Sequence, residues 1–340
     1  MKLTSLISIF LFAHCLVKAQ NQFDVNWGGV EKLKERLTAQ KVGKEPGFSL
    51  LIAYKDSIIL TYHNGVEDVD AQKPIGDSTS FYIASIAKTF TSAAILKLRQ
   101  DKKLDLSDKI SKYLPSLPAY TKQIRIFHLL THMSGLEDYL DVLGEDLTGY
   151  KNEDVTKFVQ TRDSLLFEPG LDYSYSNTGY VLLSQIVEVV SGKKFPDYVN
   201  ENLLLPSVMF ATKAIDKPNV IVSNRAKGYN KDSLGHILKS DHQNIYTLGG
   251  GGYYSTIFDL NKWVIALKKG GVIPQRSFDL MTSFPIALTG KKSYIGMGWT
   301  NESWGSKTKG MSRPEKSLHV IGLVYNTKFS FFLTPLLIDF

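Results

Sequence analysis

Ser85 and Lys88 are the residues of this chain whose types and spacing most clearly indicate chemistry. They begin an alanine-rich apolar run that continues to Leu96. Side chains three positions apart share one face of a helix, so the serine hydroxyl and the lysine amine can touch. Burial and the positive end of a helix both disfavour a protonated lysine at this place. A neutral Lys88 would take the proton from Ser85, which predicts an activated serine nucleophile that needs no histidine.

The same Ser-x-x-Lys spacing occurs twice more, from Ser191 to Lys194 and from Ser306 to Lys309. Neither of these strings begins a long apolar helix. A serine followed by a lysine at this spacing is usually a helix N-cap with a surface lysine. The sequence on both sides of Ser85 therefore favours Ser85 as the nucleophile.

That surrounding sequence resembles the serine β-lactamase-like family, in the branch that holds class C β-lactamases, D-alanyl-D-alanine carboxypeptidases and related esterases. The resemblance extends from about Gly47 to about Trp299. The runs that carry it are Asp77 to Ala84 before the serine, and Leu96 to Asp108 with Tyr113-Leu114-Pro115 after it. It implies hydrolysis through an acyl-enzyme on Ser85, with Lys88 moving a proton.

The family's second motif, Tyr-x-Asn, matches Tyr175-Ser176-Asn177, which follows a Pro-Gly turn and leads into an apolar helix. The resemblance makes Tyr175 the base for acylation and the acid toward the leaving group. A lysine cation nearby should ease ionisation of Tyr175. Asn177 would bind the substrate amide or hold Lys88 in place. The alternative for Tyr175 is a packed aromatic residue with a satisfied hydroxyl. Three strings without this context also match the motif: Tyr62-His63-Asn64, Tyr150-Lys151-Asn152 and Tyr198-Val199-Asn200.

The family's third motif, Lys-Thr-Gly or His-Thr-Gly, binds the substrate carboxylate, and this tripeptide does not occur in the sequence. Two imperfect candidates follow Gly296-Met297-Gly298-Trp299, namely Lys307-Thr308-Lys309-Gly310 and His319-Val320-Ile321-Gly322. His319 fits the spacing from Trp299 better and is the predicted substrate-binding residue. The alternative is an ordinary histidine on an edge strand.

Four consecutive glycines, Gly249 to Gly252, resemble a phosphate-binding loop. No Gly-Lys-Ser or Gly-Lys-Thr follows them, as such a loop requires. The resemblance instead implies a glycine-rich turn before a helix. Glycines let the backbone approach a pocket closely, and Ser255 or Thr256 can cap the helix.

His128 and His132 are four positions apart and Glu137 follows, which is a pattern seen at metal sites. The glutamate that a zinc protease has directly after the first histidine is replaced by Leu129. The family has a similar stretch with a structural role behind the pocket. The sequence therefore predicts no metal and no cofactor.

The hydrophobic pattern predicts an α+β fold. An antiparallel sheet built from both termini is flanked by helices, and a mostly helical subdomain is inserted into it, as in β-lactamases and transpeptidases. The predicted hairpin joins Gly47–Tyr54 to Ile58–Tyr62, and a further β-rich run covers Lys328 to Leu333. The predicted helices cover Val25–Leu37, Ser85–Leu98, Ile126–Leu136, Asp154–Thr161, Tyr180–Val190 and Phe258–Lys268.

Composition and the first residues indicate an exported globular protein. Of 340 residues, 21% are charged, and the net charge of +7 is spread along the chain without a basic block, which argues against nucleic-acid binding. Lys2, the apolar run Leu3–Val17 and Ala19 predict a signal peptide over residues 1–19, and hence a periplasmic or secreted protein with no membrane span after cleavage. Cys15, the only cysteine, lies inside this segment.

We therefore expect residues 20–340 to form one serine hydrolase domain, with its C-terminal strands and helix incomplete because the sequence stops at Phe340. Its expected partner is a small-molecule or peptidoglycan-derived substrate: a β-lactam, a D-alanyl peptide, or a small ester or amide. The alternative function is an inactive relative that binds peptidoglycan fragments or a protein partner. The sequence predicts no oligomeric state.

Overall fold

The computed structural model describes residues 27–39, 43–54, 56–144, 147–240, 245–291, 293, 295–299 and, for the backbone alone, 318–324. The chain divides into two compact units, Met1–Lys41 with Ile338–Phe340, and Val42–Leu337. The described part of the first unit is helix α2, Trp27–Ala39, close to the range predicted for it. None of the described helices is long and apolar enough to cross a membrane.

An antiparallel sheet brings together distant parts of the larger unit. Its described strands are β1 (Phe48–Tyr54), β2 (Ser57–Asn64) and β10 (Leu318–Val324), in the order β10-β1-β2. β1 and β2 form the predicted hairpin, in which Asp56 adopts a left-handed φ of 69° that aspartate tolerates better than most residues. β10 pairs with β1 from the far end of the sequence. The predicted α+β fold, with a sheet built from both ends, is confirmed.

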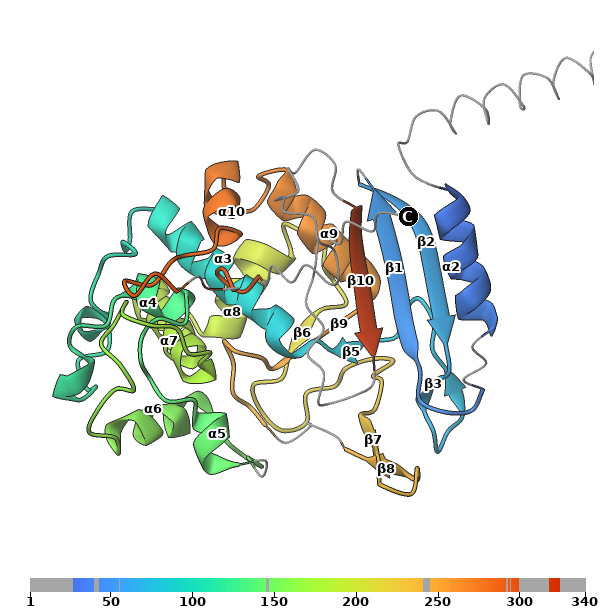
Figure 1. Ribbon diagram of the computed structural model, residues 1–340, viewed down its shortest axis with the longest axis horizontal. Coiled ribbons are helices and arrows are strands. Elements are labelled where there is room, and N and C mark those ends of the chain that lie inside the picture. The colour runs from blue at the N-terminus through green and yellow to red at the C-terminus, as the bar shows by residue number, and fades with distance from the viewer. Residues whose placement is uncertain are drawn as a thin grey trace, which may run out of the picture. The chain divides into compact units, whose positions relative to one another are not determined.

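A helical block occupies the sequence between β2 and β10 and lies beside the sheet (Figure 1). Its centre is α3 (Ala87–Gln100), which is preceded by the 3-10 turn η1 (Ala84–Ile86). Helix α3 packs against α7 (Asn177–Ser191). Helices α4 (Ile126–Leu130), α6 (Asn152–Gln160) and α8 (Phe195–Val199) pack on α7 in turn. Helix α9 (Ile257–Lys268) packs against strands β1 and β10 of the sheet.

The remaining elements are short. The strands are β3 (Val66–Asp68), β4 (Lys73–Pro74), β5 (Phe81–Tyr82), β6 (Lys213–Ala214), β7 (Tyr229–Lys231), β8 (Ile237–Lys239) and β9 (Tyr253–Ser255). The helices are α5 (Tyr139–Leu143) and α10 (Gln275–Met281), with the 3-10 turns η2 (Ile110–Lys112) and η3 (Ala119–Thr121) and the π-helical turn η4 (Asn200–Leu204).

The predicted helix over Ile126–Leu136 is wrong in its second half. α4 ends at Leu130, and His132 adopts a left-handed φ of 58° that no α-helix accommodates. The chain then leaves the helix and runs toward the start of α7. Hydrophobic periodicity continues past Leu130 because these loop residues are buried as well.

Helix α3 is buried along almost its whole length. Phe90 stacks edge-to-face on Trp263 and on Tyr253, with ring centroids 5.0 and 5.4 Å away. The indole N–H of Trp263 donates a hydrogen bond to the Thr89 hydroxyl at 3.0 Å. These contacts from β9 and α9 fix α3 in position, and with it the residues of its first turn.

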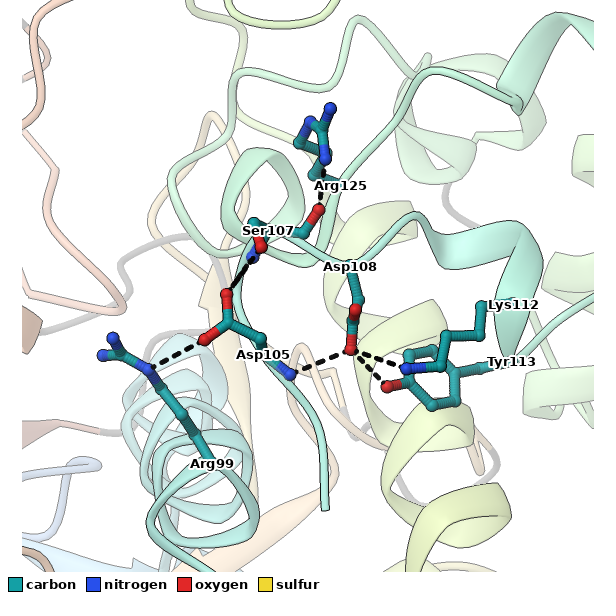
Figure 2. Close-up of polar contacts among 7 residues, drawn as sticks. All are labelled: Arg99, Asp105, Ser107, Asp108, Lys112, Tyr113 and Arg125. Carbon is teal, nitrogen blue, oxygen red and sulfur yellow. Dashed lines mark hydrogen bonds and ion pairs between the residues drawn. The ribbon is translucent and has the colours of Figure 1, made fainter. Parts of the chain in front are cut away.

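Two aspartates fold the connection that follows α3 (Figure 2). Asp108 accepts hydrogen bonds from the Asp105 N–H at 2.9 Å, the Lys112 amine at 3.1 Å and the Tyr113 hydroxyl at 2.6 Å. Asp105 accepts bonds from both the N–H and the hydroxyl of Ser107. This turn belongs to the run that carries the family resemblance. The resemblance in this run therefore reflects the requirements of the fold.

A glycine contact holds the segment 296–299 against α3. Gly298 has a φ of 84°, and a Cβ atom built on it would lie 2.9 Å from the carbonyl carbon of Lys88 and 3.0 Å from the nitrogen of Thr89. A side chain at this position would displace either the segment or the first turn of α3. Only glycine fits both the close approach and the left-handed φ.

We expect Gly298→Ala to lower the free energy of unfolding more than Gly290→Ala does. Gly290 has a similar φ of 81°, but a Cβ there meets nothing within 4 Å. Left-handed strain, roughly 1–2 kcal/mol for a residue with a side chain, is common to both variants. The difference therefore measures the contact with α3. Chemical denaturation of the two variants tests this, and equal losses would show that segment 296–299 need not lie against α3.

Candidate active site

Ser85 lies where strand β5 gives way to η1 and α3, and its side chain is half-buried. Ala84, directly before it, has a left-handed φ of 43°. Such strained residues persist only where the surrounding structure holds them, and they cluster at functional sites. The Nζ atom of Lys88 lies 3.1 Å from Ser85 Oγ. The predicted contact is present, although Ser85 lies in the 3-10 turn rather than in α3 itself.

Lys88 is buried, with 2% of its surface exposed, and its amine has three polar neighbours. They are Oδ1 of Asn177 at 2.6 Å, the carbonyl oxygen of Gly250 at 2.9 Å and Ser85 Oγ at 3.1 Å. The first two oxygens can only accept hydrogen bonds. A neutral amine has two N–H bonds and one lone pair. It therefore satisfies both acceptors and turns its lone pair toward the serine hydroxyl.

Burial lowers the pKa of Lys88 to about 7, and the negative charge of Asp138 opposes this shift. A large share of Lys88 is therefore neutral near pH 7. This agrees with the expectation that burial depresses the pKa of this lysine.

Tyr175 contacts Ser85 from the other side, with its hydroxyl oxygen 2.8 Å from Ser85 Oγ. Burial raises the pKa of Tyr175 to about 12; the Ser85 hydrogen bond opposes the shift and Asp138 adds to it. The expectation that Tyr175 would ionise more easily here is wrong, because burial disfavours the phenolate and raises the pKa of Tyr175. Tyr175 is a protonated phenol at neutral pH.

The four glycines form a turn that brings backbone against this site. The Gly250 carbonyl binds Lys88, and a Cβ atom at Gly250 would lie 3.2 Å from Asn177 Oδ1 and 3.4 Å from Lys88 Nζ. Thr256 then caps α9 by accepting a hydrogen bond from the Asp259 N–H at 3.1 Å. The predicted combination of a close-approaching turn and a capped helix is present.

Two residues hold the Tyr175–Asn177 segment from behind. Asp138 accepts hydrogen bonds from the backbone N–H and the side-chain Nδ2 of Asn177, at 3.0 and 2.7 Å. His132 accepts one from the Ser176 N–H at 3.1 Å and stacks on the Tyr175 ring, with centroids 4.5 Å apart. No group of histidines and acids in the described parts of the chain could hold a metal ion. His132 has the structural place that the resemblance implied.

Asp138 was missed by the sequence analysis. Its only signal there is that of an N-cap residue, and it does cap α5 by accepting the Leu140 N–H at 3.1 Å. Nothing in the sequence links it to Asn177, because 39 positions separate them.

His319 is described through its backbone alone, in β10 opposite Ala53. Its part in substrate binding stays a prediction. The rival candidate at residues 307–310 lies outside the described residues, and so does Ser306. Ser191 is the last residue of α7. Of the rival Tyr-x-Asn strings, Tyr62 lies in β2 and Tyr198 in α8.

Curated proteins with similar sequences include a penicillin-binding protein. Penicillin-binding protein 4* of Bacillus subtilis (strain 168) is 30% identical over 267 residues, which cover 73% of this chain and 58% of that protein. Protein flp of Staphylococcus aureus (strain MW2) is 30% identical over 229 residues, which cover 65% and 45%. The chain thus spans about half the length of these curated relatives.

Solved structures share the fold at lower identity. The octameric penicillin-binding protein homologue from Pyrococcus abyssi has a TM-score of 0.75 and 24% identity, covering 90% of this chain and 74% of that one. D-amino acid amidase from Ochrobactrum anthropi SV3 has a TM-score of 0.69 and 23% identity, covering 83% and 86%. EstCE1, a hydrolase with promiscuous acyltransferase activity, has a TM-score of 0.71 and 20% identity, covering 88% and 95%.

The sequence profile of the β-lactamase family matches residues 35–331, which include every residue of the site described above. This match covers most of the chain, and the solved structures agree with it in fold. The chain belongs to the β-lactamase family.

Proposed function

We propose that this protein is a serine hydrolase that forms an acyl-enzyme on Ser85. The observation that carries the proposal is the position of Ser85 Oγ, within hydrogen-bond distance of both Lys88 Nζ and Tyr175 OH, at 3.1 and 2.8 Å. A half-buried hydroxyl in this position can lose its proton to the amine on one side. The phenol on the other side is placed to protonate the leaving group. Membership of the β-lactamase family supports the same class of reaction.

In acylation, Lys88 is the general base. Its neutral amine takes the proton of Ser85 while Oγ forms a bond to the substrate carbonyl carbon. The N–H groups of a first helical turn have no partner within the helix, so the Ser85 N–H is available for the developing oxyanion. Tyr175 gives its proton to the leaving nitrogen or oxygen as the bond to the carbonyl carbon breaks, and the proton on Lys88 then restores the phenol.

Water completes the cycle. It attacks the carbonyl carbon of the acyl-enzyme while Lys88 takes one of its protons, and that proton passes to Ser85 Oγ as the ester bond breaks. Each cleaved ester or amide bond consumes one water molecule and leaves the enzyme unchanged.

Asn177 fits a holding role better than a substrate-binding role. Its Oδ1 atom contacts Lys88, and its Nδ2 atom contacts Asp138. Both ends of the amide therefore have a partner inside the protein. The Lys88 contact is the shortest of the three that the amine makes, so Asn177 is well placed to fix the base beside Ser85.

The substrate class in this proposal is a β-lactam, a D-alanyl peptide, or a small ester or amide. The sequence has no Lys-Thr-Gly or His-Thr-Gly to bind a substrate carboxylate. Neutral short esters are therefore the preferred substrates. The proposal includes export to the periplasm or beyond, on the grounds of Lys2 and the apolar run Leu3–Val17.

Replacing Ser85 by alanine is expected to abolish covalent labelling by a fluorophosphonate probe, because Ser85 is the proposed nucleophile. Ser191→Ala is the matched control, since Ser191 has the same Ser-x-x-Lys spacing but ends α7. In-gel fluorescence of the purified protein measures both. Labelling that persists in Ser85→Ala would contradict the assignment, and an unlabelled wild type would favour the inactive binding protein.

The acylation rate is expected to rise with pH through about 7 and to level off above it, because only the neutral form of Lys88 accepts the serine proton. Lys88→Met removes the base and should reduce the rate by at least ~10²-fold. Stopped-flow acylation by p-nitrophenyl acetate between pH 5.5 and 9.5 measures the profile. A rate that keeps rising up to the end of this range would mean that Lys88 has an ordinary pKa.

p-Nitrophenyl butyrate is expected to be turned over with a higher kcat/KM than benzylpenicillin. A charge-assisted hydrogen bond to a carboxylate contributes roughly 1.5–3 kcal/mol, so a missing clamp reduces kcat/KM about 10- to 150-fold for substrates that need it. Parallel steady-state assays on one preparation make the comparison. Faster penicillin hydrolysis would show that a clamp exists, and His319→Ala would then test whether His319 supplies it.

A further inference from the structure

Asp138 is a buried carboxylate whose hydrogen-bond acceptors are directed at Asn177 and at the start of α5. It is 7% exposed. Its Oδ1 atom accepts the Leu140 N–H at 3.1 Å, and its Oδ2 atom accepts both N–H groups of Asn177, at 3.0 and 2.7 Å. N–H donors favour the ionised form of a carboxyl group, although burial raises the pKa of Asp138.

These bonds decide which way the Asn177 amide points. Nδ2 faces the carboxylate, so Oδ1 faces Lys88 Nζ at 2.6 Å. The flipped amide would direct its carbonyl oxygen at the carboxylate, which is a repulsive contact. Its N–H groups would face the lysine amine, where they would repel the protonated form or occupy the lone pair that the neutral form turns toward Ser85. The chain Asp138–Asn177–Lys88–Ser85 therefore has one favourable orientation.

We propose that Asp138 is a positioning residue for the Ser85–Lys88 pair: it fixes the amide of Asn177 so that Oδ1 holds the lysine amine, and its negative charge helps the amine to keep a proton once it has accepted one. This inference rests on the proposed function where it concerns acylation. Its statement about Lys88 holds for the folded protein whether or not it is an enzyme.

The other titratable groups around Lys88 are neutral near pH 7. The phenol rings of Tyr175 and Tyr180 lie 4.9 and 5.4 Å from Lys88 Nζ, and burial raises the pKa of both. Burial and the nearby Lys88 lower the pKa of His132 well below its usual value. Asp138 is thus the charge that Lys88 senses among these described groups, and it raises the pKa of the lysine.

Removing this charge and loosening the site have opposite effects, which makes the proposal testable. Without the Asp138 charge, burial acts on Lys88 unopposed and its pKa falls below about 7. If Asp138 only supported the local fold, its loss would admit water and move the pKa of Lys88 upward, toward the usual 10.5.

The test is a carbon NMR titration of the intact protein with ¹³C at lysine Cε, in which the Lys88 signal is assigned by its absence from Lys88→Met. We expect the Lys88 midpoint to fall in Asp138→Asn and to stay in place in Asp141→Asn, a matched control on the exposed face of α5. An unchanged or a raised midpoint in Asp138→Asn would overturn the proposal.

Asp138→Glu separates the two parts of the role and serves if Asp138→Asn fails to fold. It keeps the charge but moves the carboxylate away from the Asn177 donors. The Lys88 midpoint should stay close to that of the wild type, while the pH-independent acylation rate should fall roughly 10-fold or more from misplacement of the base. Acylation at the wild-type rate would show that the amide needs no positioning by Asp138.

Acylation of the same variants by the fluorophosphonate probe links the inference to function. Asp138→Asn is expected to be slower than Asp141→Asn even at a pH above both midpoints, because the amide has lost its anchor. If wild type is not acylated at all, the proposed function fails. The NMR titration still decides whether Asp138 acts on Lys88.

Discussion

The buried amine of Lys88 is the constraint on which the rest of this site depends. A lysine in a protein interior favours its neutral form, since water no longer solvates the ammonium. Here the amine is also surrounded by oxygen atoms that give each of its N–H bonds an acceptor and leave one direction for Ser85. Burial supplies a base at neutral pH, and the oxygen atoms fix where that base points.

The fold meets this constraint by joining three distant segments at one point. The turn η1 and the start of α3 carry Ser85 and Lys88, the entry to α7 carries Tyr175 and Asn177, and the glycine turn contributes a backbone carbonyl. Small residues make the approach possible: the glycine turn reaches the amine directly, and segment 296–299 lies on the backbone of α3 through Gly298. Phe90 and its aromatic neighbours hold the same helix from its other side.

Much of this arrangement is predictable from the sequence, for reasons that are local. A serine and a lysine one turn apart, an apolar helix after them and a Pro-Gly turn before Tyr175 each follow from short-range geometry. The hairpin β1–β2 and helix α9 likewise follow from alternation, periodicity and glycine stops.

The parts that were missed depend on contacts between distant segments. The raised pKa of Tyr175 follows from burial, which the sequence does not give. The early end of α4 follows from the left-handed His132, and the contact of Asp138 with Asn177 follows from how the loop after α4 meets α7. The structural role that the family resemblance implied for His132 likewise gains its contact only in the fold, where the ring accepts the Ser176 N–H.

The most direct test of this account is the pH dependence of stability of the wild type compared with Lys88→Met. Lys88 has a folded-state pKa of about 7 against 10.5 when unfolded, so between these values the unfolded chain holds one more proton. Stability then rises with pH, and the wild type should gain about 1.4 kcal/mol per pH unit relative to Lys88→Met between pH 7.5 and 9.5. Well below pH 7, where Lys88 is protonated in both states, the difference should be constant. Urea denaturation at each pH measures it, and a difference that stays flat up to pH 9.5 would contradict a neutral buried lysine.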